Sequence, residues 1–109
     1  MDIEKYRLNE LELLTFEGRV LKRVIYTDGE IGGWIEKTAN LSQYGTCRIV
    51  GNAKAMDDTQ ILDRAFIGRD AILQDRSIAG GDCTITDNAR IGGGAVVLGH
   101  AVIWGDAQL

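Results

Sequence analysis

The sequence predicts an all-β fold, a single-stranded parallel β-helix with a triangular cross-section, about four coils and an N-terminal β-hairpin cap. Small residues recur every six positions from Cys47 to Ala107, and an apolar residue follows each of them two positions later, from Ile49 to Leu109. An α-helix spaces apolar residues three or four apart and a simple strand spaces them two apart, so neither explains a period of six. A short strand and a corner, repeated, do explain it, and this repeat is typical of a parallel β-helix.

The apolar positions define the inside of the β-helix. Side chains alternate across a strand, so the small and the apolar residue of each hexad both point inward. Three hexads make one coil, and residues eighteen positions apart should therefore stack about 4.8 Å apart. The stacked aliphatic residues form three predicted ladders, which are Ile49, Ile67, Ile85 and Ile103, then Ala55, Leu73, Ile91 and Leu109, and finally Ile61, Ala79 and Val97.

Glycine, asparagine and aspartate fill the corners between the predicted strands. Gly51-Asn52, Asp57-Asp58 and the glycines at 92–94 all fall there. These residue types adopt the left-handed αL conformation at the lowest cost, which a tight corner needs. Turn geometry therefore explains the glycines better than a phosphate loop does, and it explains the paired aspartates better than a metal or acid–base site.

Residues 1–32 lack the repeat, and we expect them to cap the N-terminal end of a β-helix that spans residues 33–109. The segment Phe16-Glu17-Gly18-Arg19 lies between two β-prone runs and predicts a hairpin turn. A cap is needed because the end of a solenoid exposes strand edges and core side chains. From Leu41 to Ile49 the step is eight residues instead of six, which predicts a two-residue bulge at that corner.

Composition excludes several function classes. The chain has 109 residues, enough for one domain, with 12 basic and 16 acidic side chains spread along it. A net charge of −4 argues against nucleic acid or an anionic membrane as a partner. No apolar run approaches the ~20 residues of a membrane span, and the first residues lack the apolar core of a signal peptide, so we expect a cytoplasmic protein. We expect no cofactor.

Two cysteines, Cys47 and Cys83, are two coils apart in the predicted stacking. Their separation would be about 9–10 Å, which is beyond the reach of a disulfide. We interpret both as small buried apolar residues rather than as a metal or redox pair.

Two sets of residues resemble known families. The hexads at 67–71 (Ile-Gly-Arg-Asp-Ala) and 91–95 (Ile-Gly-Gly-Gly-Ala) are similar to the hexapeptide signature of left-handed β-helices, and this resemblance implies a left-handed winding. Lys5-Tyr6-Arg7-Leu8, the segment at 32–36 (Gly-Gly-Trp-Ile-Glu) and the segment at 40–53 resemble YdcK-like hexapeptide-repeat proteins of bacteria and prophages. That resemblance implies the fold and a bacterial or phage origin. It implies no catalytic residues, although the family is often described as containing transferases.

His100 is the one candidate for a catalytic base. Acyltransferases with this fold are trimers that use a histidine between subunits, and stacking places Asp82 one coil from His100, where it could orient the imidazole. The alternative interpretation is a solvated surface pair, which we favour. Zinc carbonic anhydrases of this fold need three histidine ligands, and the chain has one histidine. We therefore predict no metal site.

The outward positions indicate an interaction surface instead. Two faces of the predicted prism carry apolar residues on neighbouring coils. Together they would form apolar patches too large to remain exposed to water on a small protein. We predict an interface that also includes the open last coil; its residues are Leu62, Ile78, Val96 and Leu98 on one face, Val50, Phe66, Val102 and Trp104 on the next, and Leu109. The third face, with Lys54, Arg90 and few apolar residues, is more polar.

Three functions fit this pattern. The first is a non-enzymatic structural or protein–protein interaction module, encoded by a bacterium or a phage, that self-associates as a dimer or trimer. The second is a trimeric acyltransferase that uses His100. The third is a phage-encoded inhibitor that binds a host protein. The first accounts best for apolar faces combined with the absence of a catalytic motif.

Overall fold

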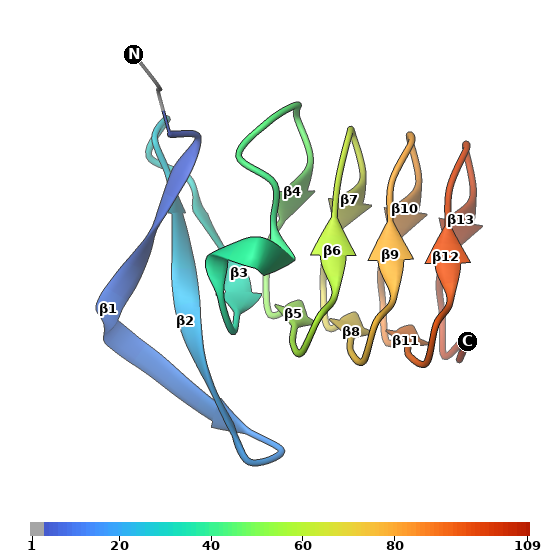
Figure 1. Ribbon diagram of the computed structural model, residues 1–109, viewed down its shortest axis with the longest axis horizontal. Helices are drawn as coiled ribbons and strands as arrows, with labels where there is room; N and C mark the ends of the chain where they lie inside the picture. Colours follow the sequence, from blue (N-terminus) through green and yellow to red (C-terminus); the bar gives the residue numbers. More distant parts are fainter. Residues whose placement is uncertain (1–3) are drawn as a thin grey trace.

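The computed structural model describes residues 4–109, which are almost entirely β-structure. β1 (Tyr6–Phe16) and β2 (Arg19–Tyr26) form an antiparallel hairpin at one end of the molecule; β3 (Ile31–Ile35) and a 3-10 helix, η1 (Thr38–Asn40), then begin the first coil (Figure 1). The remaining strands have two residues each: β4 (Arg48–Ile49), β5 (Lys54–Ala55), β6 (Gln60–Ile61), β7 (Phe66–Ile67), β8 (Ile72–Leu73), β9 (Ile78–Ala79), β10 (Thr84–Ile85), β11 (Arg90–Ile91), β12 (Val96–Val97) and β13 (Val102–Ile103).

The short strands stack in three parallel sheets, which are the walls of a triangular prism. Wall A contains β3, β5, β8 and β11, wall B contains β6, β9 and β12, and wall C contains β4, β7, β10 and β13. The register confirms the predicted ladders, which are Ile49–Ile67–Ile85–Ile103 on wall C, Ala55–Leu73–Ile91 on wall A and Ile61–Ala79–Val97 on wall B. The bridge between Arg90 and Gln108 places Leu109 beside Ile91, as the ladder predicts, although Leu109 is 57% exposed. From β4 onward, each coil therefore takes eighteen residues.

The chain winds in a left-handed sense. In Figure 1 it runs upward along wall B, which faces the viewer, and returns downward along wall C behind it. It advances from left to right from coil to coil, and this combination defines a left-handed helix. The winding is thus opposite to the right-handed preference of ordinary crossover connections between parallel strands.

Every corner from Gly45 to Gly105 contains one residue in the left-handed backbone region. The φ angles at these positions lie between 55° and 73° and recur every six residues, as the composition of the corners predicts. The positions are Gly45, Gly51, Asp57, Asp63, Arg69, Asp75, Gly81, Asp87, Gly93, Gly99 and Gly105.

The aspartates at these corners make a hydrogen bond that offsets the cost of their backbone conformation. The Asp63 carboxylate accepts the backbone N–H of Gly81 at 2.8 Å, and that of Asp75 accepts the N–H of Gly93 at 2.7 Å. Two further corner aspartates repeat the contact with the corner one coil further on. Aspartate is therefore used where its side chain can join successive coils.

The first coil is longer than the others. Trp34 pairs with Lys54 and Leu41 bridges to Ile61, so both offsets are twenty residues instead of eighteen. The two extra residues lie in the loop between Leu41 and β4, which confirms the predicted bulge.

The inside of the prism is a column of small and aliphatic side chains. Cys47 and Cys83 are both free and fully buried, and burial raises the pKa of the Cys83 thiol. Thr59 and Ser77 occupy small inward slots, and their hydroxyl oxygens lie 3.3 Å apart, so one hydroxyl donates to the other. A buried polar pair that satisfies its own hydrogen bonds costs little in stability.

The hairpin closes the N-terminal end of the prism on all three walls. On wall A, β2 pairs with β3 and continues the sheet. On wall B, the Tyr6 hydroxyl donates to the carbonyl oxygen of Leu41 at 2.5 Å. On wall C, the Tyr26 hydroxyl donates to the carbonyl oxygen of Ile49 at 3.0 Å and accepts the N–H of the same residue at 2.7 Å. Backbone groups that a further coil would have paired are thus satisfied by tyrosine side chains.

Candidate interaction surface

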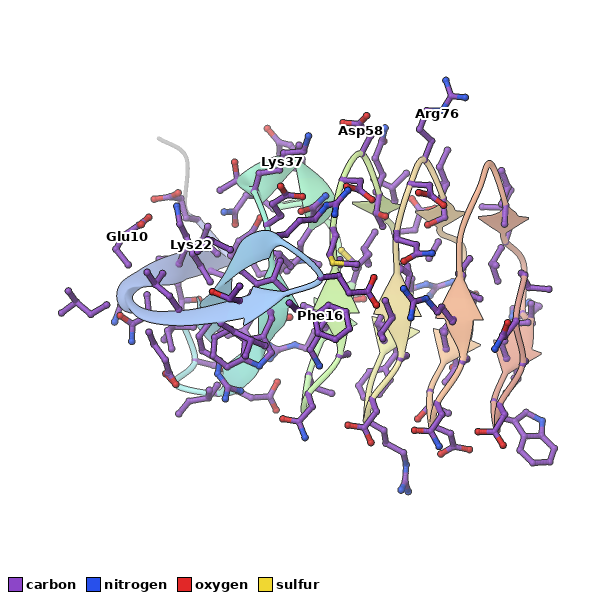
Figure 2. The ribbon with its side chains drawn as sticks, turned by 90° about the horizontal axis from the view of Figure 1, so that it is seen from below. Glu10, Phe16, Lys22, Lys37, Asp58 and Arg76 are labelled. Carbon is purple, nitrogen blue, oxygen red and sulfur yellow. The ribbon has the colours of Figure 1, made fainter. Side chains whose placement is uncertain are left out.

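Wall A is covered by the protein's own hairpin, an arrangement that the sequence did not indicate. From the N-terminal end of the prism, the hairpin tip reaches along the outside of wall A, where the Phe16 ring lies against Lys54 (Figure 2). Under it, Trp34, Met56 and Leu21 form a second apolar cluster and are 8%, 1% and 0% exposed. The few apolar residues of this wall are therefore already packed.

Ion pairs hold the hairpin tip in place. Arg19 contacts Asp57 with an Nε–Oδ1 distance of 2.5 Å, and Arg90 contacts Glu17 with an Nη2–Oε1 distance of 2.7 Å. The polar residues that distinguish wall A in the sequence thus serve an intramolecular contact. Pairs this exposed contribute little each, so the apolar cluster is the main source of stability.

Wall B presents a continuous apolar strip. Leu62 and Ile78 are half-buried, whereas Val96 and Leu98 are 55% and 54% exposed. Gly80 lies between Leu62 and Leu98 at the equivalent position of the middle coil. A Cβ atom at Gly80 would come within 3.0 Å of a Leu98 methyl group, so the Leu98 side chain lies over the glycine, toward Leu62. The four predicted residues of this face therefore lie on one surface.

Wall C is divided. Phe66 is 43% exposed and, with the half-buried Val50, lies against Gly68. Val102 and Trp104 are 60% and 67% exposed, and the strand between the two pairs is β10, whose coil carries threonines at the outward positions 84 and 86. The sequence prediction counted apolar residues on this face and did not weigh these threonines.

The last coil carries the densest apolar surface. Its outward residues on walls B and C are Val96, Leu98, Val102 and Trp104, which we call the collar. Leu109 is 57% exposed next to it. Between 91 and 109 the only acidic or basic side chain besides the histidine is Asp106, although 26% of the whole chain is charged. Depletion of charge around exposed apolar residues is the compositional signature of a protein–protein interface core.

The open end of the prism lies beside the collar. β12 and β13 are the outermost strands of their sheets, and the core residues Ala95, Ala101 and Ile103 are only partly buried there. In the preceding coil, the N–H groups of Ile78 and Thr84 donate to carbonyls of the next coil at 2.9 Å. The equivalent N–H groups of the last coil have no backbone acceptor within residues 4–109.

His100 and Asp82 lie together, as the stacking predicts, but on an open ridge. The His100 Nδ1 is 3.4 Å from Asp82 Oδ2, and the imidazole is 88% exposed. Arg64 shares the same carboxylate, with an Nε–Oδ1 distance of 2.6 Å. The arrangement can hold an imidazole in one orientation, but no group around it excludes water.

Other site chemistries lack support in the described part of the chain. Residues 4–109 contain no group of three or more histidine, cysteine, aspartate or glutamate side chains placed to hold a metal ion. Two shallow hollows lie on the corner ridges, one beside Asn52 and Asp70 and one beside Arg19 and Arg76. Among the described residues, no helix has the length and apolar character needed to cross a membrane.

Sequence reasoning missed the surface of the hairpin. Leu11, Leu13 and Val20 are 95%, 54% and 50% exposed on its outer side. β1 has an irregular register between Asn9 and Leu13, which projects Leu11 outward. No repeat marks these positions, so the pattern that located the collar could not locate them.

The comparisons with known proteins add no family. No protein-family model and no curated protein matches this chain.

Proposed function

We propose that this β-helix is a non-enzymatic interaction module that self-associates through the collar. The observation that carries the proposal is the contrast between its walls. Trp34 and Met56 on wall A are buried by the hairpin, whereas Val96, Leu98, Val102 and Trp104 are each more than half exposed. Exposed apolar residues that are contiguous and lack neighbouring charge mark contact surfaces.

The energetics support a partner on this surface. Burying one large aliphatic or aromatic side chain contributes about 1.5–3 kcal/mol. Each collar residue is already partly buried, so covering the rest of its side chain would contribute about half of that amount. Much of this gain offsets the cost of immobilising two molecules, so a weak association that depends on concentration is expected. A second copy of the chain presents the same uncharged surface, so it meets little like-charge repulsion.

Sedimentation velocity across a concentration series tests the proposal. We expect the 109-residue chain to shift from monomer to a dimer or trimer as concentration rises. The double variant Leu98→Lys/Trp104→Lys should remain monomeric. The matched control is Leu11→Lys, which replaces the most exposed apolar residue of the hairpin and should associate like the original chain. A monomer at every concentration would rule out self-association.

The contact between His100 and Asp82 favours acyl transfer as a second candidate. An oriented imidazole can remove a proton from an acceptor hydroxyl or amine. Calorimetry with acetyl-coenzyme A tests this function, since binding that is lost in His100→Ala would support it. Absence of binding at millimolar donor would end it.

A further inference from the structure

We propose that Lys5 and Cys47 form a reversible covalent link under oxidising conditions, and that this link ties the hairpin cap to the first coil. The Lys5 Nζ atom donates a hydrogen bond to the Cys47 sulfur at 3.2 Å. Lys5 directly precedes β1 and Cys47 directly precedes β4, so a bond between them would join two elements that are far apart in the sequence. The inference does not rest on the proposed self-association.

The backbone around Lys5 is fixed on both sides, which keeps its amine beside the sulfur. The Gln43 side chain accepts the N–H of Lys5 at 2.7 Å and donates to the carbonyl of Tyr6 at 3.1 Å. The Lys5 carbonyl accepts the N–H of Thr27 at 2.9 Å, and the ammonium also donates to the carbonyl of Cys47 at 2.8 Å. Two groups held in contact in this way react as if at a very high local concentration.

The two cysteines differ in their surroundings although both are fully buried in inward slots. The Cys47 sulfur accepts a hydrogen bond from an ammonium group, and cysteines beside a positive charge are the reactive ones. Burial raises the pKa of the Cys83 thiol, against a backbone hydrogen bond at Gly80 that lowers it. We therefore expect Cys47 to react with an oxidant and Cys83 to stay a thiol.

The Cys47 sulfur lies directly beneath the loop that lengthens the first coil. It contacts the carbonyl oxygens of Ser42 and Tyr44 at 3.6 and 3.8 Å. Residues 44–46 of this loop are exposed, and Lys5 is half-buried. A small displacement of the loop or of the Lys5 side chain would admit a small oxidant, so the coils need not unfold.

Hydrogen peroxide is the oxidant that the first step uses. The Cys47 sulfur attacks one peroxide oxygen, so an S–O bond forms, the O–O bond breaks and a sulfenic acid results. The Lys5 ammonium gives a proton to the departing oxygen, which leaves as water, and the thiol proton passes to solvent. The sulfur is thus oxidised by two electrons, the peroxide is reduced, and Lys5 becomes a neutral amine.

The second step is a condensation of this amine with the sulfenic acid. The Lys5 nitrogen attacks the sulfur, an S–N bond forms and the S–O bond breaks, and the hydroxyl leaves as water with one proton from the nitrogen. Sulfenic acids condense in the same way with backbone nitrogen atoms. A thiol reductant reverses the link, because two of its thiols restore the Cys47 thiol and the Lys5 amine and become a disulfide.

Peptide mapping of the original 109-residue chain after peroxide treatment tests the link. Trypsin does not cleave at a modified lysine, so residues 1–7 should appear joined to residues 38–48, with the mass of the two peptides less two hydrogens. A thiol reductant should remove this species. Cys47 recovered as a free thiol or as a sulfinic acid, without a joined peptide, would overturn the proposal.

Two variants provide the matched controls. Cys83→Ser should give the same yield of joined peptide as the original chain. Lys5→Arg keeps a positive hydrogen-bond donor but removes the amine, so oxidation should stop at a Cys47 sulfenic acid that dimedone labels. Equal oxidation of Cys47 and Cys83 in the original chain would show that peroxide reacts with an unfolded form, and this result would also overturn the proposal.

The link should also change the stability of the protein. It closes the chain between residues 5 and 47, and a crosslink of this kind restricts the unfolded state. We expect a higher urea midpoint for the linked protein and a return to the original midpoint after reduction. Equal midpoints before and after reduction would contradict a link that ties the cap to the first coil.

Discussion

Replacing Tyr26 by phenylalanine removes one hydroxyl from the closed end of the prism. The hydroxyl donates to the carbonyl of Ile49 and accepts the N–H of the same residue, at 3.0 and 2.7 Å. Tyr26 is 2% exposed and Ile49 is 0% exposed, so water does not reach these groups in the folded protein. The phenylalanine ring would keep the packing, including the Arg48 guanidinium 4.2 Å from the ring centre.

The expected loss is large because two buried backbone groups lose their partner together. Each unsatisfied group costs about 1–3 kcal/mol, so the loss of both partners in Tyr26→Phe should lower the free energy of unfolding by about 2–6 kcal/mol. Urea unfolding followed by far-ultraviolet circular dichroism measures this change, and an unchanged m-value would show that both states keep their compactness. Tyr44→Phe is the control, since Tyr44 is 82% exposed and should change stability by less than about 0.5 kcal/mol. A loss for Tyr26→Phe as small as that of the control would refute the argument that hydroxyls complete the sheet edges.

Three further predictions concern pH, the ladders and the corners. Burial raises the pKa of Tyr6 to about 12, so unfolding releases a proton from this group above pH ~10. The free energy of unfolding should therefore stay level below pH ~10 and fall as the pH rises from about 10 towards 12. Urea midpoints that stay constant over that range would contradict this prediction. Ile85→Ala should lower the free energy of unfolding by about 2–5 kcal/mol, because Ile85 is fully buried within its ladder. Ile103→Ala should lower it less, because Ile103 is only partly buried. Equal losses of stability in thermal unfolding would show that the last coil is as well packed as the interior. Asp75→Gly should lower the free energy of unfolding by about 0.5–2 kcal/mol, since glycine keeps the φ of 63° but loses the hydrogen bond from the N–H of Gly93. Asp75→Ala should lower it more, because alanine is also strained at that φ. The reverse order in chemical denaturation would argue against this account of the corner.

The repeat was sufficient to predict the ladders but not the course of the hairpin. Ile49, Ile67 and Ile85 stack as predicted because a period of eighteen residues fixes each inward side chain against its like. The same count located the two-residue bulge before β4. The contacts of Phe16 and Glu17 with wall A depend on the angle at which the hairpin leaves the first coil. No local pattern encodes that angle, since it results from tertiary packing.

The candidate surface was predictable only in part, for a related reason. Val96 and Leu98 follow from strand alternation, which sets which residues point outward. How much of a wall stays exposed depends on what the rest of the chain covers. Met56 is one of the outward residues of wall A, yet it is 1% exposed because the hairpin lies over it. The closing role of Tyr6 was also not predictable, because a tyrosine near the start of a strand has no distinguishing pattern.

The hairpin is long enough to contact two different coils of the prism, so its contacts depend on the number of coils. Its tip is fixed to two different coils, since Arg19 contacts Asp57 and Glu17 contacts Arg90. Removing the eighteen residues 69–86 would leave every ladder in register, yet it would slide Gln108 into the place now held by Arg90. Glu17 would then face an amide instead of a guanidinium. The coils are interchangeable in the core, but on the outside of wall A the hairpin contacts particular coils. The number of coils between its two contacts is thus linked to the hairpin, which precedes all the coils in the sequence.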